Sequence, residues 1–331
     1  MEYLLLTAVF VSFFLAMMAL PSWISKCRRV GLVWEDMNKF GHPKNVAATG
    51  GIVIIMAFVL GVLYYVALKT FLFSGTNNSV EIFSLLGVIL ILGIVGLTDD
   101  LLGWKNHGLP IRVRIALAFI ASVPLVVIKA GQPLVAVPFF GMVNFGIIYP
   151  LIIIPLGIAG ASTTYNFLAG FNGLEAGLGV LILSFLSFVA YFTGSPWLAI
   201  VGLCMVASLI AFLVYNEYPA KVFPGDVLTY SIGALIAGMA ILGNFEKIAV
   251  IVFIPFIIEV FLKSRGKLKK QSFGIPDKKG NLSLPYNKIY GLEHLAIFIL
   301  NKFGKATEKK VVYLLYAFQI LFILIAFLVL I

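Results

Sequence analysis

Charged side chains are scarce in this chain of 331 residues. Asp, Glu, Lys and Arg make up 11% of it, about half the share found in soluble domains, and 61% of the residues are hydrophobic. This deficit excludes a soluble globular protein. Apolar runs of roughly 18 to 23 residues recur along the chain, and this length matches the hydrocarbon core of a bilayer. Short alternating segments, which would indicate a membrane β-barrel, are absent. The composition therefore predicts a helical protein that crosses a membrane many times.

Cysteine and histidine are also rare, with two and three copies. Cys27 falls in a predicted loop and Cys204 within a predicted span, so no disulfide framework or thiolate metal site is expected. The histidines are scattered one to a loop, and their spacing predicts no metal site. One of them, His107, follows two acids in the same short loop and is a candidate for contact with phosphate groups.

The apolar runs predict a polytopic all-α membrane protein with about ten transmembrane helices. We expect one domain covering residues 1–331, with a long polar segment at 264–310. The predicted spans lie near residues 3–22, 48–68, 82–98, 112–129, 147–166, 174–193, 197–215, 226–243, 247–263 and 311–331.

Lysine and arginine are distributed unevenly between the two sides of these spans. All but three of the 24 basic residues follow odd-numbered spans, the exceptions being Lys69, Lys129 and Lys247. Because cytoplasmic loops are enriched in Lys and Arg, both termini are predicted to lie outside, and the odd loops, including 264–310, to be cytoplasmic. Membrane insertion and anionic head groups then explain the net charge of +10, so no nucleic acid partner is expected.

Two adjacent acids stand where a predicted span meets water. Asp99 and Asp100, in GLTDDLLGWK, follow the run 82–98, at a helix end where the macrodipole is negative and carboxylates are disfavoured. Two like charges side by side add to that cost. A functional role is therefore the favoured interpretation, because acids that meet basic residues at a membrane face suit a charged substrate and a divalent cation.

Other polar residues leave a structural and a functional interpretation open. Asp226 in VFPGDVLTY stands where it could N-cap the next helix, and Asn172 and Glu175 are spaced as a capping box. Glu259 lies within a span, one turn from Lys263, and this spacing predicts a local ion pair rather than catalysis.

The stretch TTYNFLAGFNGLEAGLG, residues 163–179, combines glycines with two asparagines. Helix packing through small residues explains the last two glycines, but not the asparagines. Glycine lets a backbone approach a ligand closely, and the Asn166 amide offers a neutral oxygen that suits a hard cation.

Several blocks along the chain resemble the polyprenyl-phosphate N-acetylhexosamine-1-phosphate transferases, in particular the dolichyl-phosphate GlcNAc-1-phosphotransferases of eukaryotes and archaea. NFLAGFNGLEAG and VFPGD are specific to that family, whereas an Asp-Asp pair alone is not. The blocks are EDMNKFGHPKNVAATGG (35–51), GLTDDLLGWK (96–105), YNFLAGFNGLEAG (165–177), YNEYPAKVFPGDVLTYSIG (215–233) and, more weakly, GIPDKKGNLSLPYNK (274–288).

The resemblance implies an enzyme with its active site on the cytoplasmic face. Such an enzyme transfers GlcNAc-1-phosphate from UDP-GlcNAc to a dolichyl-type polyprenyl phosphate and releases UMP, which is the first step of lipid-linked oligosaccharide synthesis. The resemblance also implies Mg²⁺ as cofactor, with Mn²⁺ as a substitute, and a homodimer. The expected location is the cell membrane, or the endoplasmic reticulum membrane if the chain is eukaryotic.

The resemblance also assigns roles to individual residues. Asn166 and Asp226 would hold the metal, while Asp99 and Asp100 would serve the acceptor phosphate. Phe223 would line the sugar pocket. The residues expected to receive the nucleotide are Met37, Gly170, Asn172 and Glu175.

The basic residue that binds the pyrophosphate is not settled by the resemblance. This chain has KSRGKLKKQSFGIPDKK (263–279) where the family carries a motif rich in arginine and histidine, and Gly103 replaces an asparagine. Lysine lacks the bidentate fork of arginine, so the two are not equivalent at such a site. Lys105 is the first choice, as part of the catalytic set; the other candidates are Lys44, Arg112, Arg114 and Arg265.

Two other functions stay open from the sequence. One is the same chemistry with another UDP-N-acetylhexosamine or with undecaprenyl phosphate. The other is a secondary transporter, which shares broken glycine-rich spans but should carry charges near the bilayer midplane. For the enzyme, Asp99 is the candidate base, although a phosphate monoester with a second pKa of about 6 is already mostly dianionic. A two-step route through an aspartyl-phosphate is equally compatible with the sequence.

Overall fold

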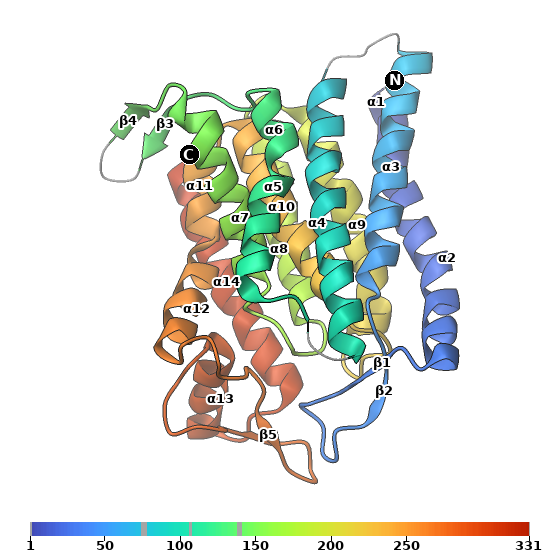
Figure 1. Ribbon diagram of the computed structural model, residues 1–331, viewed down its shortest axis with the longest axis vertical. Coiled ribbons are helices and arrows are strands. Elements are labelled where there is room, and N and C mark those ends of the chain that lie inside the picture. Colours follow the sequence, from blue (N-terminus) through green and yellow to red (C-terminus); the bar gives the residue numbers. More distant parts are fainter. Residues whose placement is uncertain (1, 74–77, 106–107, 138–140, 331) are drawn as a thin grey trace.

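The structure is a computed structural model that describes residues 2–73, 78–105, 108–137 and 141–330. The described residues form a bundle of helices along one long axis, with short strands at both ends (Figure 1). Seven helices are long and apolar enough to cross a membrane, and the chain is a multi-pass helical membrane protein. They are α2 (Thr7–Val30), α3 (Gly51–Leu72), α4 (Ser79–Lys105), α8 (Leu174–Phe192), α9 (Pro196–Asn216), α10 (Asp226–Gly243) and α14 (Glu308–Leu330).

Three predicted spans, 112–129, 147–166 and 247–263, are each broken into two helical pieces. In the spans 112–129 and 247–263, the second helical piece has a proline in its first turn, Pro124 and Pro255 respectively. Proline cannot donate a helical hydrogen bond and clashes with the preceding turn, so the helix breaks there. In the span 147–166, a π-helix precedes the α-helix. The pieces are α5 (Ile111–Ala121) and α6 (Val123–Val127), η1 (Tyr149–Ile153) and α7 (Ile154–Tyr165), and α11 (Glu246–Val252) and α12 (Ile254–Arg265).

Short elements occupy the two ends of the bundle, and the all-α prediction did not include their strands. The strands pair antiparallel as β1–β2, β3–β4 and β5–β6. In Figure 1, β1–β2 and α13 lie at one end, here called the loop-rich end, while β3–β4 and both termini lie at the other. These elements are α1 (Glu2–Leu5), β1 (Val33–Glu35), β2 (Lys44–Ala47), β3 (Leu134–Val137), β4 (Gly141–Asn144), β5 (Ile275–Pro276), β6 (Leu282–Ser283) and α13 (Leu292–Phe303).

Helix α4 is longer than predicted, and this changes the setting of two acids. The predicted span ended at residue 98, but the helix continues to Lys105. Asp99 and Asp100 therefore lie inside its last two turns rather than after its end, and Asp99 is buried.

Helix α10 lies at the centre of the bundle. It packs against α3, α4, α7, α8, α9 and α11 and is buried along nearly its whole length. A helix that is apolar on all sides belongs in a core. Its first residue, Asp226, is therefore held at the middle of the loop-rich end.

Candidate active site

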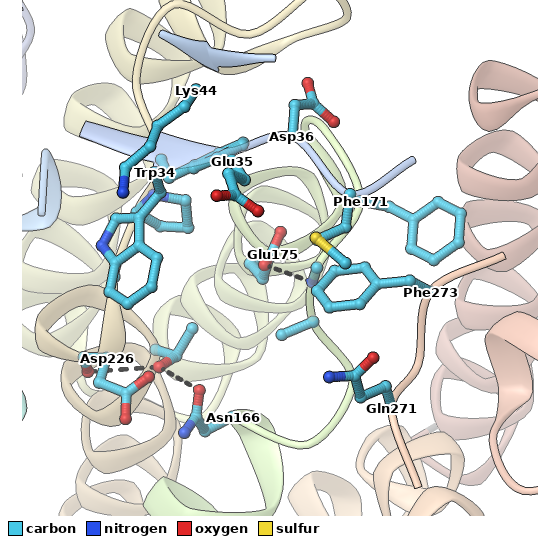
Figure 2. Close-up of a pocket in the computed structure, with 17 residues that line it drawn as sticks. Trp34, Glu35, Asp36, Lys44, Asn166, Phe171, Glu175, Asp226, Gln271 and Phe273 are labelled. Carbon is cyan, nitrogen blue, oxygen red and sulfur yellow. Dashed lines mark hydrogen bonds between the residues drawn. The ribbon is translucent and has the colours of Figure 1, made fainter. Parts of the chain in front are cut away.

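A cavity of about 510 Å³ opens at the loop-rich end (Figure 2). Its walls come from the β1–β2 region, the turn between α7 and α8, the start of α10, and the segment after α12. The lining residues are Trp34, Glu35, Asp36, Met37, Lys44, Asn166, Ala169, Gly170, Phe171, Glu175, Phe223, Pro224, Gly225, Asp226, Thr229, Gln271 and Phe273.

Seven of the predicted site residues share this cavity. They are Met37, Lys44, Asn166, Gly170, Glu175, Phe223 and Asp226. Sequence reasoning did not single out Trp34, Thr229, Gln271 or Phe273. Gln271 and Phe273 lie in the stretch 263–279, which the sequence marked as a departure from the family motif, and Phe273 directly precedes the weaker block 274–288; no periodicity singled out their side chains. Trp34 directly precedes the block 35–51 and Thr229 lies within the block 215–233, and these positions were the available signal.

The turn before α10 is held by Asp100. Its carboxylate accepts hydrogen bonds from the amides of Asp226, at 2.9 Å, and Val227, at 3.4 Å. Gly225, with a φ of 71°, is the N-cap residue, and a Cβ there would collide with the Asp100 carboxylate. Asp100 thus caps α10 from a neighbouring helix and does not line the cavity. The interpretation of Asp226 as the capping side chain is wrong, which leaves its carboxylate facing the cavity.

Asp99 and Asp226 share one guanidinium. Nη1 of Arg114, on α5, donates to Asp99 Oδ2 at 2.9 Å, to Asp226 Oδ2 at 3.4 Å and to the Tyr230 hydroxyl at 3.3 Å. Asp99 also accepts the Leu109 amide and does not line the cavity. Arg114 therefore joins α4, α5 and α10 behind the cavity wall.

Contacts with other elements offset part of the electrostatic cost expected for the acid pair. Because α4 continues past both acids, they do not face its own negative end. Asp100 instead faces the amides at the start of α10, where the helix dipole is positive, and Asp99 faces Arg114.

Asn166 is oriented by the neighbouring helix α10. It follows α7 directly, and its Oδ1 accepts a hydrogen bond from Thr229 Oγ1 at 2.9 Å. Thr229 also donates to the Asp226 carbonyl at 3.2 Å, so the amide and the acid are held on the same side of the cavity (Figure 2).

The turn between α7 and α8 does not form the capping box suggested by its spacing. The N-cap of α8 is Gly173, and Glu175 Oε1 reaches back to accept the Gly170 amide at 2.8 Å. Nδ2 of the Asn172 side chain donates to Asp36 Oδ2 at 3.1 Å, and the backbone N–H of Asn172 donates to Glu308 Oε1 at 2.8 Å. Asn172 lines a separate cavity of about 160 Å³ and not the large one, contrary to expectation.

The predicted basic residues occupy different places. Lys105, Arg112 and Arg265 are exposed and do not line the cavity, so the structure does not bring them to it. Lys44 lines the cavity, and Arg114 contacts Asp226 in its wall without lining it. His107 lies outside the described residues.

Glu259, in α12, forms the predicted ion pair with Lys263, at 3.4 Å, which is confirmed. Lys263 also donates to the Phe167 carbonyl, next to Asn166. Glu293, in α13, is fully buried near Glu259, and burial, followed by repulsion from Glu259, raises the pKa of Glu293 well above its usual range.

The donor set suits a magnesium ion that is shared with a substrate. Three carboxylates converge with one guanidinium, so a divalent cation would reduce the excess negative charge. Among the described residues no group of three His, Cys, Asp or Glu side chains could hold a metal alone. Asp226 and Asn166 offer two oxygens on the cavity wall, and Mg²⁺ commonly takes only one or two protein ligands beside phosphate oxygens. The residues present fit this ion.

Comparison with known proteins identifies the family. The model of "Glycosyl transferase family 4" matches residues 82–244. A relative from Saccharolobus solfataricus, provisionally named UDP-N-acetylglucosamine–dolichyl-phosphate N-acetylglucosaminephosphotransferase, is 34% identical over 97% of this chain and 95% of its own. The chain belongs to glycosyl transferase family 4.

Other members of glycosyl transferase family 4 extend the comparison. The Dictyostelium discoideum protein with the same enzyme name is 30% identical over 83% of this chain and 74% of its own. A phospho-N-acetylmuramoyl-pentapeptide-transferase from Halalkalibacterium halodurans is 28% identical over 81% and 86%. The region 82–244 contains Asp99, Arg114, Asn166 and Asp226, whereas Gln271 and Phe273 lie beyond it.

Proposed function

We propose that this family member transfers GlcNAc-1-phosphate from UDP-GlcNAc to a dolichyl-type polyprenyl phosphate. The products are UMP and GlcNAc-pyrophosphoryl lipid, and the reaction starts lipid-linked oligosaccharide synthesis. The observation that carries the proposal is the shared guanidinium of Arg114 on Asp99 and Asp226, beside a cavity at one end of a membrane bundle. The names of the archaeal and Dictyostelium relatives support the same substrates.

In the proposed complex the donor spans the cavity. The planar base lies at the Gly170 turn, the sugar lies near Phe223, and Lys44 faces the phosphates. Arg114 does not line the cavity and would reach the phosphates past Asp226. Arg114 is preferred to Lys105 because it contacts Asp226, which lines the cavity, whereas Lys105 is exposed. Nη1 of Arg114 donates to Asp99, Asp226 and Tyr230, so its other terminal nitrogen, Nη2, stays available for a phosphate oxygen.

In the proposed step, an oxygen of the acceptor phosphate forms a bond to the β-phosphorus of the donor. The bond from that phosphorus to the bridging oxygen breaks, and UMP leaves with the bridging oxygen. Mg²⁺, held by Asn166 and Asp226, would neutralise charge on the pyrophosphate. Asp99 and Asp100 act as positioning residues, because their oxygens are engaged by Arg114, Leu109 and the start of α10. Positioning and charge screening therefore supply most of the catalysis.

The proposed topology counts the three broken helices as spans. Together with the seven long helices they would give ten crossings, with both termini outside and the loop-rich end in the cytoplasm. The bias of lysine and arginine supports this orientation. We further propose a single domain, a homodimer, and residence in the cell membrane, or in the endoplasmic reticulum membrane of a eukaryote.

The test is a panel of substrates with the purified full chain. UDP-GlcNAc, UDP-GalNAc and UDP-MurNAc-pentapeptide are each paired with dolichyl phosphate and undecaprenyl phosphate, and UMP release is measured. We expect the highest rate with UDP-GlcNAc and dolichyl phosphate. The alternative is the same chemistry on other substrates, as the name of the Halalkalibacterium relative illustrates. A higher rate with another N-acetylhexosamine donor or with undecaprenyl phosphate would replace the proposed substrates. Uptake of a solute without UMP release would instead indicate the transporter.

A further inference from the structure

One wall of the cavity is formed by residues 269–291, here called the cover segment. Gln271 and Phe273 are its lining residues, and Figure 2 shows both on the side of the cavity away from Asp226. The Phe273 ring packs directly on Gly170, since a Cβ at Gly170 would stand 2.7 Å from a ring carbon. Gly170 has a φ of 108°, a conformation that disfavours residues with a side chain. Because no Cβ is present, the Phe273 ring can lie directly against the Gly170 backbone.

Asn38 joins the cover segment to the turn that it covers. Its side chain is buried, between β1 and β2. Nδ2 donates to the Gly170 carbonyl at 2.9 Å, and Oδ1 accepts the Gly274 amide at 3.1 Å. Both ends of the amide are therefore used, and they connect positions 132 and 236 residues away in the sequence.

No second hydrogen bond among the described residues duplicates this connection, although Lys278 Nζ also lies 5.9 Å from the centroid of the Phe40 ring in the same hairpin. The bond from Gly274 to Asn38 is the one hydrogen bond that links the cover segment to any described residue before Lys263. Its remaining hydrogen bonds are internal or reach residues 264–307, such as the bond from the Leu282 amide to the Ala306 carbonyl at 2.8 Å. Losing the Asn38 amide would leave two backbone groups unpaired, and they would regain partners most easily by moving into water.

We propose that Asn38 is a positioning residue that latches Phe273 against Gly170 and so completes the subsite for the donor's base. The inference rests on the proposed function, because it takes the base to lie at the Gly170 turn. An aromatic side chain can stack on any nucleobase, so a held ring favours donor binding. An unlatched ring must be ordered again each time the donor binds, and affinity falls by that cost.

The first test does not require activity. The full chain in detergent is digested briefly with trypsin, and cleavage after Lys270, three residues before Phe273, is followed by mass spectrometry. Asn38→Ala is expected to be cleaved about tenfold faster than the unchanged protein, because the cover segment opens more often. Asn45→Ala is the matched control, since Asn45 lies in the same hairpin, is exposed, and makes no recorded side-chain hydrogen bond. Equal cleavage rates for the two variants would overturn the latch.

The second test is a double-mutant cycle between Asn38→Ala and Phe273→Ala. Each change is expected to raise the KM for UDP-GlcNAc about tenfold, with the KM for the lipid unchanged and kcat altered less than about twofold. The double variant should match the single ones, because both remove the same wall. Additive effects, or an equal rise in the lipid KM, would refute the proposal. If the unchanged protein released no UMP from any donor, the proposed function would fail, while the trypsin comparison would still decide on the latch.

Discussion

The guanidinium of Arg114 is the feature on which the charge arrangement of the site depends. Replacing it with lysine keeps one positive charge but supplies a single nitrogen. Nη1 of Arg114 serves three acceptors on two helices, at distances between 2.9 and 3.4 Å. A lysine ammonium could hold Asp99 and Asp226, but it would then have no second nitrogen to offer a phosphate.

The size of the effect follows from the interaction that is lost. A hydrogen bond to a charged group contributes roughly 1.5–3 kcal/mol, which corresponds to about 10- to 150-fold in rate. Arg114 is about a quarter exposed, so solvent screening favours the lower end of that range. Arg114→Lys should therefore lower kcat about tenfold to thirtyfold while the protein stays folded. Arg114→Met should lower it further and also destabilise the fold, because Asp99 would be left buried without its partner.

The assay is UMP release by the purified variants, together with thermal unfolding in the same detergent. Arg112→Lys is the matched control, since Arg112 lies on the same helix but is exposed and does not line the cavity. It should retain its rate. Full activity in Arg114→Lys, or an equal loss in Arg112→Lys, would refute the reasoning about the shared guanidinium.

Three further changes test other parts of the site. Gly225→Ala should lower the unfolding temperature and abolish UMP release, because Gly225 has a φ of 71° and an added Cβ would collide with the Asp100 carboxylate. An unchanged unfolding temperature would count against Asp100 as the cap of α10. Thr229→Val should raise the Mg²⁺ concentration needed for half-maximal UMP release several-fold, since Asn166 loses the donor that orients it; an unchanged Mg²⁺ curve would argue against Asn166 as a ligand. Burial raises the pKa of Glu293, so the unfolded chain releases its proton at lower pH, and stability should fall as pH rises above 4.5. Glu293→Gln should remove the part of the fall in unfolding temperature with pH that Glu293 causes. An unaltered dependence on pH would contradict this role of Glu293.

Much of the helical framework could be predicted from the sequence because apolar runs have a length set by the bilayer. The run that became α10 matches its prediction at both ends, residues 226 and 243. The broken spans were missed because hydropathy reports burial in lipid and not continuity of hydrogen bonds. Pro124 and Pro255 stood in the sequence as signals for those breaks, but tertiary packing decides whether a proline bends or divides a helix.

The site was only partly predictable because its contacts cross long distances in the sequence. Asn166 and Asp226 could be found from glycine-rich and turn patterns next to apolar runs. Nothing local to Asp100 indicates that it caps a helix 126 residues later. Sequence reasoning placed Arg114 behind Lys105, and only the packing of α5 against α4 and α10 brings Arg114 to Asp99 and Asp226 while Lys105 is exposed. Asn38 and Gly274, next to Phe273, meet only after the segments of the loop-rich end have folded on one another.

The most direct test of the central claim uses UDP-GlcNAc labelled with phosphorus-32 at the β-phosphate. It is supplied with a polyprenyl phosphate to the unchanged protein and to Asp226→Asn, whose carboxylate lines the cavity. The account predicts that the label moves to the lipid together with the sugar as unlabelled UMP appears, and that Asp226→Asn stops this transfer while unfolding at the same temperature. Label retained in released UDP, or undiminished transfer by Asp226→Asn, would contradict it.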